Sequence, residues 1–476
     1  MRRSYSTTLS MLAALAVLTA WYFLYEKKFK VTSTQKEETA KQFVQLTQSD
    51  VQEIVLERMK NPPSEDAEAT PPPGPVSYDR IHLKKLGDNW ALTEPIEDTA
   101  DSSAVSSLLS SVITAKQDRV VDDTPKDLSL FSLKDPIIKL TLIKDSTKKE
   151  QILFGRKTPV GFGVYVMNTD RKAVYKASQS VRSGVEKTVK DLRNRSLTSV
   201  TRADVNEVEV SGKANYVLKR AEKDAWLLAR ENLPADANET NKLVGALVDL
   251  KATDFPSEDG KNLAQYGLSP AGLRVVLSTS AKDKPRTVLL LGQASGKTYA
   301  KRDDKPTVYE VAADTWSKTT VASEKLRSLE VAHFNRFDIK RIKIERDQEP
   351  LDLLKESDWT LPAEPGTKLD TAKVDTLLTK IQDMKLARYG TTANTPRKPA
   401  LVIRLFEKKD KAETETVVLK FGALGGNEIA VERSGLSVPF FIKGVDLKAL
   451  TLDKKSLLKT ETKTENADKK PSETKR

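Results

Sequence analysis

The sequence of 476 residues has no cysteine and only two histidines. Without cysteine the chain can form no disulfide, no cysteine–zinc site and no thiol nucleophile, and it lacks the residue to which a lipoprotein anchor is attached. The histidines, His82 and His333, stand in different contexts, and no His-Glu-x-x-His pattern accompanies them. The sequence therefore predicts no metal site and no cofactor.

Motifs of hydrolytic catalysis are also lacking. No Gly-x-Ser-x-Gly nucleophile elbow occurs, and the 67 acidic residues are scattered instead of recurring as pairs at a useful spacing. Carboxylates from distant segments can still converge in a fold, as they do in glycosidases, so a cell-wall enzyme remains the least favoured alternative. We predict that the protein is not an enzyme.

Blocks of a single charge sign are nearly absent. The 79 basic and 67 acidic side chains are interleaved, so the net charge of +12 is spread over a solvated surface. No cluster of basic and aromatic residues marks a nucleic-acid groove, and we predict no nucleic-acid partner. The chain is long enough for about three ordinary domains.

Only one long uncharged run occurs, Leu9–Tyr25. As a helix it spans about 25 Å, slightly less than the hydrocarbon core of a membrane. Aromatic residues at its end suit the headgroup region. We predict one membrane anchor, with a short cytoplasmic stub, within residues 1–25. Its apolar and aromatic positions are Leu9, Leu15, Leu18, Trp21 and Tyr25.

A cleaved signal peptide is the alternative to this anchor. Ala14 and Ala16 form an Ala-x-Ala pattern, but the pattern lies inside the apolar run, and bulky aromatics end the run. Arg2 and Arg3 favour an N-terminus on the inside, although lysines also follow the run. We predict an uncleaved, single-pass protein of the inner (plasma) membrane with its body on the periplasmic or extracytoplasmic side.

The body consists of three copies of one pattern. Each copy opens with a strand in which β-branched residues or leucine alternate with charge, starting at Asp50, Asp204 and Asp338. A proline-rich insert at 61–77 lengthens the first copy. The predicted organisation is a linker at 26–49, α+β repeats at 50–200, 201–335 and 336–452, and a disordered charged tail at 453–476.

A hairpin with a tryptophan follows each opening strand, at Trp90, Trp226 and Trp359. Tryptophans in such places stack on sugars or anchor the hairpin in a core. Because the residue recurs at one structural position with apolar neighbours, the core anchor is the better interpretation.

An amphipathic helix comes next in each copy. In the first copy its apolar positions are Val105, Leu108, Leu109 and Val112. Asp101 and Asp370 are predicted N-caps. Further strands complete each copy. The predicted fold class is α+β, with an N-terminal transmembrane helix followed by three tandem repeats of antiparallel strands and amphipathic helices.

A strand that ends in glycine recurs at Gly155, Gly292 and Gly422. The middle one lies in VLLLGQASGKT (Val288–Thr298), which resembles a phosphate-binding loop. The loop is one residue short of the Gly-x-x-x-x-Gly-Lys-Ser/Thr pattern, and strand-like sequence follows where a helix is required. We therefore interpret the stretch as a hairpin turn and the glycine as a residue that permits a tight bend between paired strands.

The phrases DNWALTEPIEDTADSSAVSSLLSSV, YGLSPAG, LLLG and EKLRSLEV together resemble domain-of-unknown-function family 4340, an uncharacterised bacterial group. The resemblance spans roughly Asp50 to Leu452, and the third copy lacks the GLSP phrase. The shared positions are apolar residues, Trp, Gly and Pro, and they bring no catalytic residues. Similar members are often encoded beside transporters of the gliding-motility ABC type, so the resemblance implies an envelope role near an exporter.

From these features we predict a non-catalytic, membrane-anchored repeat protein that serves as an accessory or scaffold component of an ABC-type transporter. Its expected partners are the lipid bilayer and other envelope proteins, an ABC permease and its ATPase, because arrays of repeats present extended surfaces. The alternative is a protein that binds envelope polysaccharide or peptidoglycan, with Tyr165, Tyr299 and Phe440 as aromatic platforms.

Overall fold

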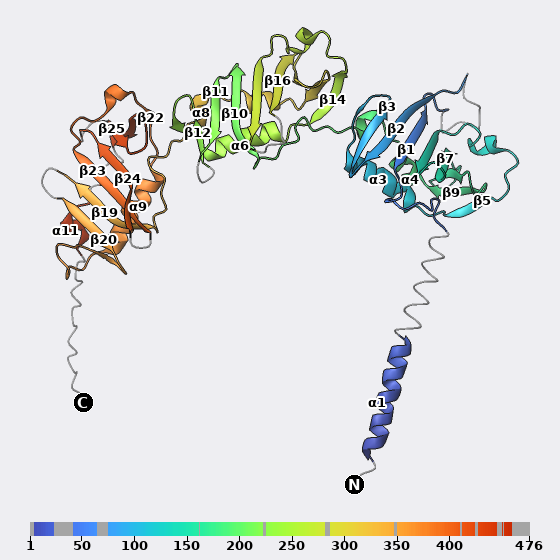
Figure 1. The fold of residues 1–476 in the computed structure, drawn as a ribbon, viewed down its shortest axis with the longest axis horizontal. Coiled ribbons are helices and arrows are strands. Elements are labelled where there is room, and N and C mark those ends of the chain that lie inside the picture. Colours follow the sequence, from blue (N-terminus) through green and yellow to red (C-terminus); the bar gives the residue numbers. More distant parts are fainter. Residues whose placement is uncertain are drawn as a thin grey trace, which may run out of the picture. The chain divides into compact units, whose positions relative to one another are not determined.

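The computed structural model describes residues 4–22, 41–63, 75–160, 162–221, 225–280, 286–346, 350–409, 412–423, 427–444, 450 and 452–458. The described body consists mostly of antiparallel sheets with a few helices packed against them (Figure 1). The chain divides into two compact parts, Met1–Ser196 with one sheet and Leu197–Arg476 with two, and we call each sheet with its helices a unit. Most of the predicted insert at 61–77 and most of the predicted tail lie outside the described residues.

The first sheet has the strand order β4-β3-β2-β1-β6-β7-β8-β9-β5. Its strands are β1 (Glu53–Met59), β2 (Tyr78–Leu86), β3 (Asn89–Glu94), β4 (Asp98–Thr99), β5 (Arg119–Asp122), β6 (Ile138–Ile143), β7 (Lys149–Lys157), β8 (Gly163–Asn168) and β9 (Val174–Ser178). All of these strand pairs are antiparallel. The opening strand β1 therefore lies in the interior of the sheet, between β2 and β6.

The second sheet repeats this order as β13-β12-β11-β10-β15-β16-β17-β18-β14. Its strands are β10 (Val205–Gly212), β11 (Tyr216–Arg220), β12 (Trp226–Leu228), β13 (Leu233–Pro234), β14 (Ala252–Ser257), β15 (Leu273–Thr279), β16 (Thr287–Ala294), β17 (Lys297–Arg302) and β18 (Val308–Val311). The opening strand β10 again pairs with the tryptophan hairpin on one side and with β15 on the other.

The third sheet has the same order with one edge strand fewer, β21-β20-β19-β23-β24-β25-β26-β22. Its strands are β19 (Ile339–Glu345), β20 (Leu351–Lys355), β21 (Trp359–Thr360), β22 (Arg388–Tyr389), β23 (Leu401–Lys409), β24 (Ala412–Phe421), β25 (Glu428–Arg433) and β26 (Phe440–Lys443). The divergent third copy therefore has the same topology as the other two, and the body is built of three repeated units.

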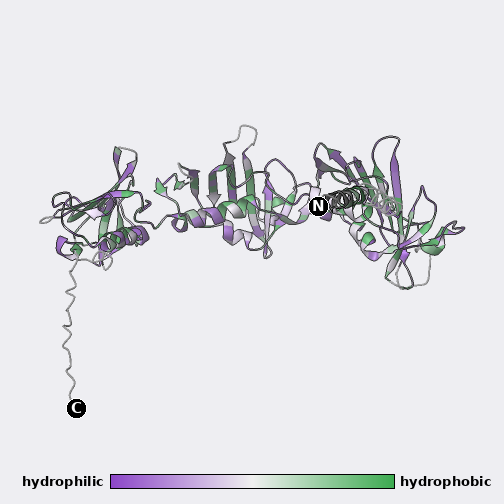
Figure 2. Cartoon of the chain, turned by 90° about the horizontal axis from the view of Figure 1, so that it is seen from below, coloured by the Kyte–Doolittle hydropathy of each residue, from purple (hydrophilic) through white to green (hydrophobic). Residues whose placement is uncertain are grey.

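One long helix per repeat packs its apolar face on the sheet: α3 (Ser102–Ile113), α6 (Ala237–Val248) and α9 (Thr371–Asp383). The buried side chains of α3 are Val105, Leu108, Leu109 and Val112. Figure 2 shows hydrophobic and hydrophilic residues intermixed along the helices and strands, as expected of elements with one buried face. Each sheet and its helix enclose a separate hydrophobic core.

The helix caps differ in part from the prediction. The carboxylate of Asp101 accepts hydrogen bonds from the backbone N–H groups of Ser103 and Ala104. In α6 the cap is Asp236, which accepts from the N–H of Glu239. Asp370 occupies the N-cap position of α9, but its side chain makes no capping hydrogen bond and instead pairs with Lys373 at 3.5 Å. Asp370 therefore stands at the predicted N-cap position, but the predicted capping hydrogen bond is wrong.

Each core also receives a short lead-in segment that precedes the opening strand. Phe43, Val44 and Leu46, predicted as linker, are buried in the first core. Leu197 and Val200 enter the second core, and Val331, Ala332 and Phe334 enter the third. Each unit therefore begins several residues before its opening strand.

The N-terminal helix α1 spans Ser4–Trp21, with 18 residues. Within the described residues, no helix is both long enough and apolar enough to cross a bilayer. The first five residues of α1 are polar or tyrosine, so its apolar stretch begins only at Leu9. Tyr25, the last residue of the predicted anchor, lies outside the described residues. The transmembrane part of the predicted fold class is not confirmed.

The stretch that resembles a phosphate loop forms a hairpin, as predicted. Strands β16 and β17 are joined by Ser295 and Gly296, with Ala294 paired to Lys297. Both turn residues have positive φ, 50° and 76°, as a two-residue type I′ turn requires. Lys297 extends from a strand and pairs with Glu310 at 2.8 Å.

Two of the three recurring glycines have a different role from the one predicted. Gly292 lies within β16, and Gly155 lies within β7 at an irregularity of its pairing with β8. A Cβ at Gly155 would lie 2.1 Å from the carbonyl oxygen of Phe131, and one at Gly292 would lie 2.1 Å from that of Gly267. These carbonyls belong to the short 3₁₀ segments η2 (Leu128–Phe131) and η4 (Leu263–Tyr266) or the residue after them. Glycine therefore lets these segments lie directly on the strand.

Gly422 has no such contact, because the nearest atom to a Cβ there is 3.4 Å away. This agrees with the sequence of the third copy, which lacks the GLSP phrase. The 3₁₀ segments of the first two units cover the outer sheet face with small apolar clusters around Leu133 and Leu268.

Candidate functional site

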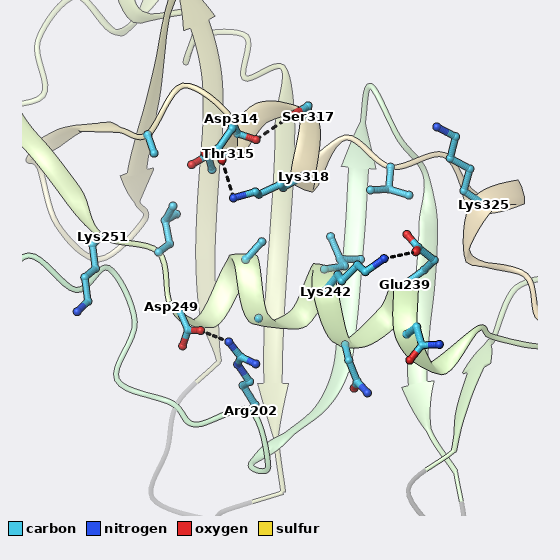
Figure 3. Close-up of a pocket in the computed structure, with 18 of the residues that line it drawn as sticks. Arg202, Glu239, Lys242, Asp249, Lys251, Asp314, Thr315, Ser317, Lys318 and Lys325 are labelled. Atoms are coloured by element: carbon cyan, nitrogen blue, oxygen red, sulfur yellow. Dashed lines mark hydrogen bonds and ion pairs between the residues drawn. The ribbon is translucent and has the colours of Figure 1, made fainter.

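The second unit contains a groove of about 1230 Å³ between α6 and the segment that carries α7 (Thr315–Thr319) and α8 (Ser323–Leu326). Residues 249–253, which lead into β14, complete one end of it. Figure 3 shows α6 running along the groove, with side chains of α6 and of the α7–α8 segment facing each other across it. The groove lies wholly within one of the two compact parts.

The helices that border this groove differ between the first two repeats at one matched pair of positions. In the first unit, α4 (Gln179–Val185) packs against α3, and a Cβ at Gly184 would lie 2.4 Å from the Cβ of Ser111. Only a residue without a side chain permits this approach. The bridges Ala100–Arg193 and Ala235–Arg327 match the first two repeats to each other. By this match Lys318 stands where the first unit has Gly184, and Ala246 stands where it has Ser111. The Lys318 side chain lies between α7 and α6 (Figure 3), at the position where the first unit has a glycine.

Apolar side chains line the interior of the groove. Leu243 and Leu250 are buried, and Ala246 and Val321 are half-buried. These residues come from α6, from the turn after it and from the segment between α7 and α8. The floor is therefore apolar, but it is shallow and open toward solvent.

Charged side chains form the rim, and most of them are paired. Lys242 contacts Glu239 at 2.7 Å, and Lys318 contacts Asp314 at 2.6 Å. The hydrogen bond from Lys242 to Glu239 raises the pKa of the lysine. A third pair joins Arg202 and Asp249 at one end of α6. The rim charges are therefore largely neutralised in pairs along both walls of the groove.

Two lysines at the ends of the groove, Lys251 and Lys325, have no ion pair with any described residue (Figure 3). An apolar floor with a polar, paired rim is the general composition of a protein-binding surface. The carboxylates of the groove accept hydrogen bonds from lysine, arginine or the backbone. The arrangement suits non-covalent binding.

The recurring tryptophans lie in the cores and do not line the groove. Trp90, Trp226 and Trp359 are all buried at the start of the second hairpin strand or one residue beyond it. Trp359 donates its indole N–H to Asp375 of α9 at 3.1 Å, which joins the hairpin to the helix. Their faces are covered by neighbouring side chains instead of being presented to a sugar.

The aromatic residues considered as glycan platforms are also packed. Phe440 is fully buried, and Tyr299 is buried with an edge-on contact to Tyr266 at 5.0 Å between ring centroids. Tyr165 is half-buried against Phe131 in the same manner at 5.1 Å. Phe440 and Tyr299 therefore offer no open ring face, and the glycan alternative loses two of its three predicted platforms.

The two histidines occupy separate surface sites. Nε2 of His82 lies 3.0 Å from a carboxylate oxygen of Glu53 on the neighbouring strand. A hydrogen bond from Lys84, together with the one from His82, lowers the pKa of Glu53. His333 is almost fully exposed and contacts Glu330 at 3.2 Å. Among the described residues, no group of three or more histidine, aspartate or glutamate side chains is arranged to hold a metal ion.

A buried ion pair that was not predicted joins the end of the first repeat to its tryptophan hairpin. Nε of Arg193 donates to Asp98 at 2.5 Å, with the two side chains 3% and 8% exposed. The second unit has the matching pair Arg327–Glu231 at 2.7 Å. The recurrence of arginine in the phrases DLRNRSL and EKLRSLEV was the available signal. The acidic partners of the two arginines stand at different positions of the hairpins, so no sequence pattern indicated them.

A second buried polar contact holds the first lead-in segment. The carboxylate of Glu150 accepts hydrogen bonds from the backbone N–H groups of Gln45 and Leu46 and from the side-chain amide of Asn168. Glu150 is 5% exposed, so these donors compensate the loss of water around its charge. This contact also has a structural function and lies apart from the groove.

The three sheets with one strand order and one helix position define a tandem-repeat protein of antiparallel units. The family model described as Domain of unknown function (DUF4340) matches residues 90–231 and 226–402, well over half of the chain, and the chain belongs to this family. No curated protein and no solved structure matches it.

The two family matches begin at the tryptophans and not at the starts of the structural units. The first runs from Trp90 through the rest of the first sheet and ends just after β12 of the second. The second begins at Trp226 and ends within β23. The unit matched in sequence is therefore offset from the unit that folds as one sheet.

Proposed function

We propose that this protein is a non-catalytic, membrane-tethered adaptor that serves as an accessory or scaffold component of an ABC-type transporter. The observation that carries the proposal is the groove of the second unit. It combines an apolar floor with a paired, charged rim, and Lys318 lines it where the first unit has Gly184. We assign the partner's docking segment to this groove.

A comparison of the second unit with the first supports the groove as a docking site. In the first unit the corresponding helices approach each other closely at Gly184 and Ser111. The strands around the groove repeat those of the first unit, so the difference concerns a surface and not the fold. A surface that differs between units of one repeated fold is suited to a function of its own, because function resides in sites added to a fold and not in the fold itself.

The tether is assigned to the apolar run Leu9–Tyr25, which includes most of α1. Large apolar side chains of α1 are exposed, among them Met11, Leu15, Val17 and Leu18 at 62–77%. Apolar residues occur around the whole circumference of this helix, as in helices that lie in an apolar environment. We propose the inner membrane as that environment and the extracytoplasmic side as the location of the repeats.

Affinity purification from lightly cross-linked, gently solubilised membranes tests the adaptor role, with the tag after Arg476. We expect an ABC permease and its ATPase to be recovered in stoichiometric amounts. Ala246→Trp places a large side chain in the groove and is expected to abolish this recovery. Ala372→Trp, on the exposed side of α9, is the matched control and is expected to recover both proteins.

Two outcomes would count against the adaptor proposal. If the wild-type protein is recovered without a permease, the transporter role is wrong. If Ala246→Trp recovers the permease as well as Ala372→Trp does, the groove is not the docking site.

Alkaline carbonate extraction tests the tether separately. The full chain is expected to stay with the membrane pellet, and a chain that lacks residues 1–25 is expected to be released. Release of the full chain by carbonate would contradict membrane insertion of the run.

A further inference from the structure

The first unit carries an apolar tip that the second unit lacks. The tip is the connection between β7 and β8, where Val160 is 82% exposed and Phe162 is 91% exposed. Phe162 is the most exposed of the large apolar side chains in the described part of the chain. The corresponding hairpin of the second unit turns through Ser295 and Gly296 alone. The apolar tip is therefore an addition to the hairpin and is not needed to form it.

Hydrogen bonds hold the tip in shape. The N–H of Thr158 donates to the carbonyl of Gly163 at 2.8 Å, and the hydroxyl of Thr158 donates to the carbonyl of Val160 at 3.0 Å. The N–H of Gln179 donates to the carbonyl of Phe162 at 3.3 Å. The backbone is thus fixed on both sides of the exposed residues, so they cannot fold back onto the sheet without breaking these bonds.

The backbone conformation of Phe162 also points to a role for its exposed ring. Its φ is 46°, in the left-handed region that bulky residues rarely adopt. Such a conformation persists where the surroundings impose it, and it is enriched at sites of binding. A glycine or asparagine would fit this backbone at lower energy, yet the position carries a phenylalanine.

Cationic side chains lie behind the tip, and acidic residues are absent from its sequence. Arg156 and Lys157 are in the last residues of β7, and the aliphatic part of Lys176 lies beside Gly163. No aspartate or glutamate occurs between Gly155 and Thr169. An apolar point in a stretch whose only charges are positive is complementary to a bilayer with anionic headgroups, since the apolar residues enter the interface and the anionic surface attracts positive charge.

We propose that the tip formed by Val160 and Phe162 inserts into the interface of an anionic bilayer and gives the first repeat a second membrane contact. This proposal rests on the proposed tether, which brings the repeat to a membrane. The occupant is the lipid surface itself, and no partner protein is required. Insertion at a second point restricts the orientation of the first repeat relative to the membrane.

The absence of cysteine from the chain permits a direct test with the full-length protein. A single cysteine introduced by Phe162→Cys is labelled with the fluorophore NBD, and the protein is reconstituted into vesicles of phosphatidylcholine and phosphatidylglycerol. We expect a blue shift of the NBD emission and quenching by nitroxide groups on the lipid acyl chains. Ser295→Cys, in the equivalent turn of the second unit, is the control and is expected to show neither.

A third label separates this proposal from the proposed tether. At Val17→Cys, in α1, the fluorophore reports insertion of the tether in the same vesicles. If the label at residue 17 is quenched by nitroxide lipids and the label at residue 162 is not, the tip proposal is wrong and the tether stands. If neither is quenched, both are wrong.

Two further results bear on the nature of the contact. Vesicles of phosphatidylcholine alone are expected to reduce the blue shift at residue 162, because the cations behind the tip then have no anionic lipid to meet. A blue shift that appears only when a partner protein is added, without quenching by nitroxide lipids, would overturn the proposal and make the tip a protein-binding surface.

Discussion

A methyl group added at Gly292 would lie 2.1 Å from the carbonyl oxygen of Gly267, a separation that real Cβ atoms essentially never show. The same conflict exists between Gly155 and Phe131, but at Gly422 the nearest atom is 3.4 Å away. The three glycines therefore look alike in the sequence but differ in what their replacement costs. A side chain at Gly155 or Gly292 would overlap with backbone atoms of a 3₁₀ segment or the residue after it, whereas a side chain at Gly422 would make only ordinary contacts.

Gly292→Ala is expected to destabilise the second unit by about 1–3 kcal/mol, the usual cost of overpacking, because strand and 3₁₀ segment must move apart. Gly422→Ala is expected to change the stability of the third unit by less than about 0.5 kcal/mol. Differential scanning calorimetry of the full-length variants compares the two. Equal effects at both positions would contradict the role assigned to Gly292.

A second residue-scale prediction concerns acid stability and Glu53. Lys84, and to a lesser extent His82, hold the pKa of Glu53 below its ordinary value of 4.5. A carboxyl group with a lowered pKa in the folded state stabilises the fold above its unfolded-state pKa, and this stability is lost as the pH falls through the folded-state pKa. The contribution of Glu53 is therefore present at pH 7 and disappears in acid.

Glu53→Gln is expected to lower the free energy of unfolding at pH 7 by up to about 1 kcal/mol, as for a partly exposed ion pair. The difference from the wild type should shrink as the pH falls below about 4.5, where protonation removes the same charge. Urea unfolding at a series of pH values measures both. A difference of unchanged size at pH 3 would show that the charge of Glu53 is not the cause. Glu356→Gln, at an exposed turn, is the control.

At the scale of elements, the end of each repeat is tied to its own tryptophan hairpin. In the first unit the N–H of Asp101 donates to the carbonyl of Leu192, and in the second the N–H of Asp236 donates to that of Leu326. An arginine follows each of these leucines and pairs with an acidic residue of the hairpin. The two pairs differ in burial, since Arg193 and Asp98 are shielded and Arg327 and Glu231 are each over a quarter exposed.

Asp98→Ala is expected to destabilise the first unit by about 3–5 kcal/mol, because it removes a buried carboxylate from a buried guanidinium. Glu231→Ala is expected to cost about 1 kcal/mol or less in the second unit, since water can reach Arg327. Calorimetry on the two variants in the full-length chain gives the comparison. If the two variants lost the same stability, burial would not decide the strength of these pairs.

The sequence predicted those elements whose signal is local. The opening strands alternate in character, and α3 carries Val105 and Leu108 on one face, so both patterns could be recognised within about a dozen residues. The roles of Gly155 and of Arg193 depend on residues far along the chain, Phe131 and Asp98, and no local pattern shows which segments meet.

The groove could not be predicted for the same reason. Its residues come from α6 and from the α7–α8 segment, and which side chains of these segments face each other is defined only when the helices are paired in space. Asp370 shows the reverse case, since the sequence placed the residue correctly but could not show that its side chain turns to Lys373.

At the scale of the whole molecule, the unit that folds differs from the unit matched in sequence. A fragment of residues 90–231 contains β3 to β9 of the first sheet but lacks β1 and β2, which lie in its interior. It contains β10 to β12 without β15, the other neighbour of β10. Residues 41–196 contain the whole first sheet, its lead-in segment and its helices.

We therefore expect residues 41–196 to fold alone, with a cooperative thermal transition and dispersed amide NMR signals. Residues 90–231 are expected to show neither, because the core of each partial sheet is open. Circular dichroism and NMR on the two purified fragments decide this. A cooperative transition in 90–231 and none in 41–196 would mean that the structural unit has been delimited wrongly.

The placement of the opening strand has a consequence for how such a chain changes in length during evolution. Every strand of a sheet pairs with strands from its own stretch of sequence, and the lead-in segment of the next unit begins only after the previous unit has closed. A duplication or deletion that begins and ends at these joints leaves the strand pairing of the remaining units intact. The number of repeats can therefore change by whole units, whereas a change that begins and ends at the tryptophans exchanges hairpins between neighbouring sheets.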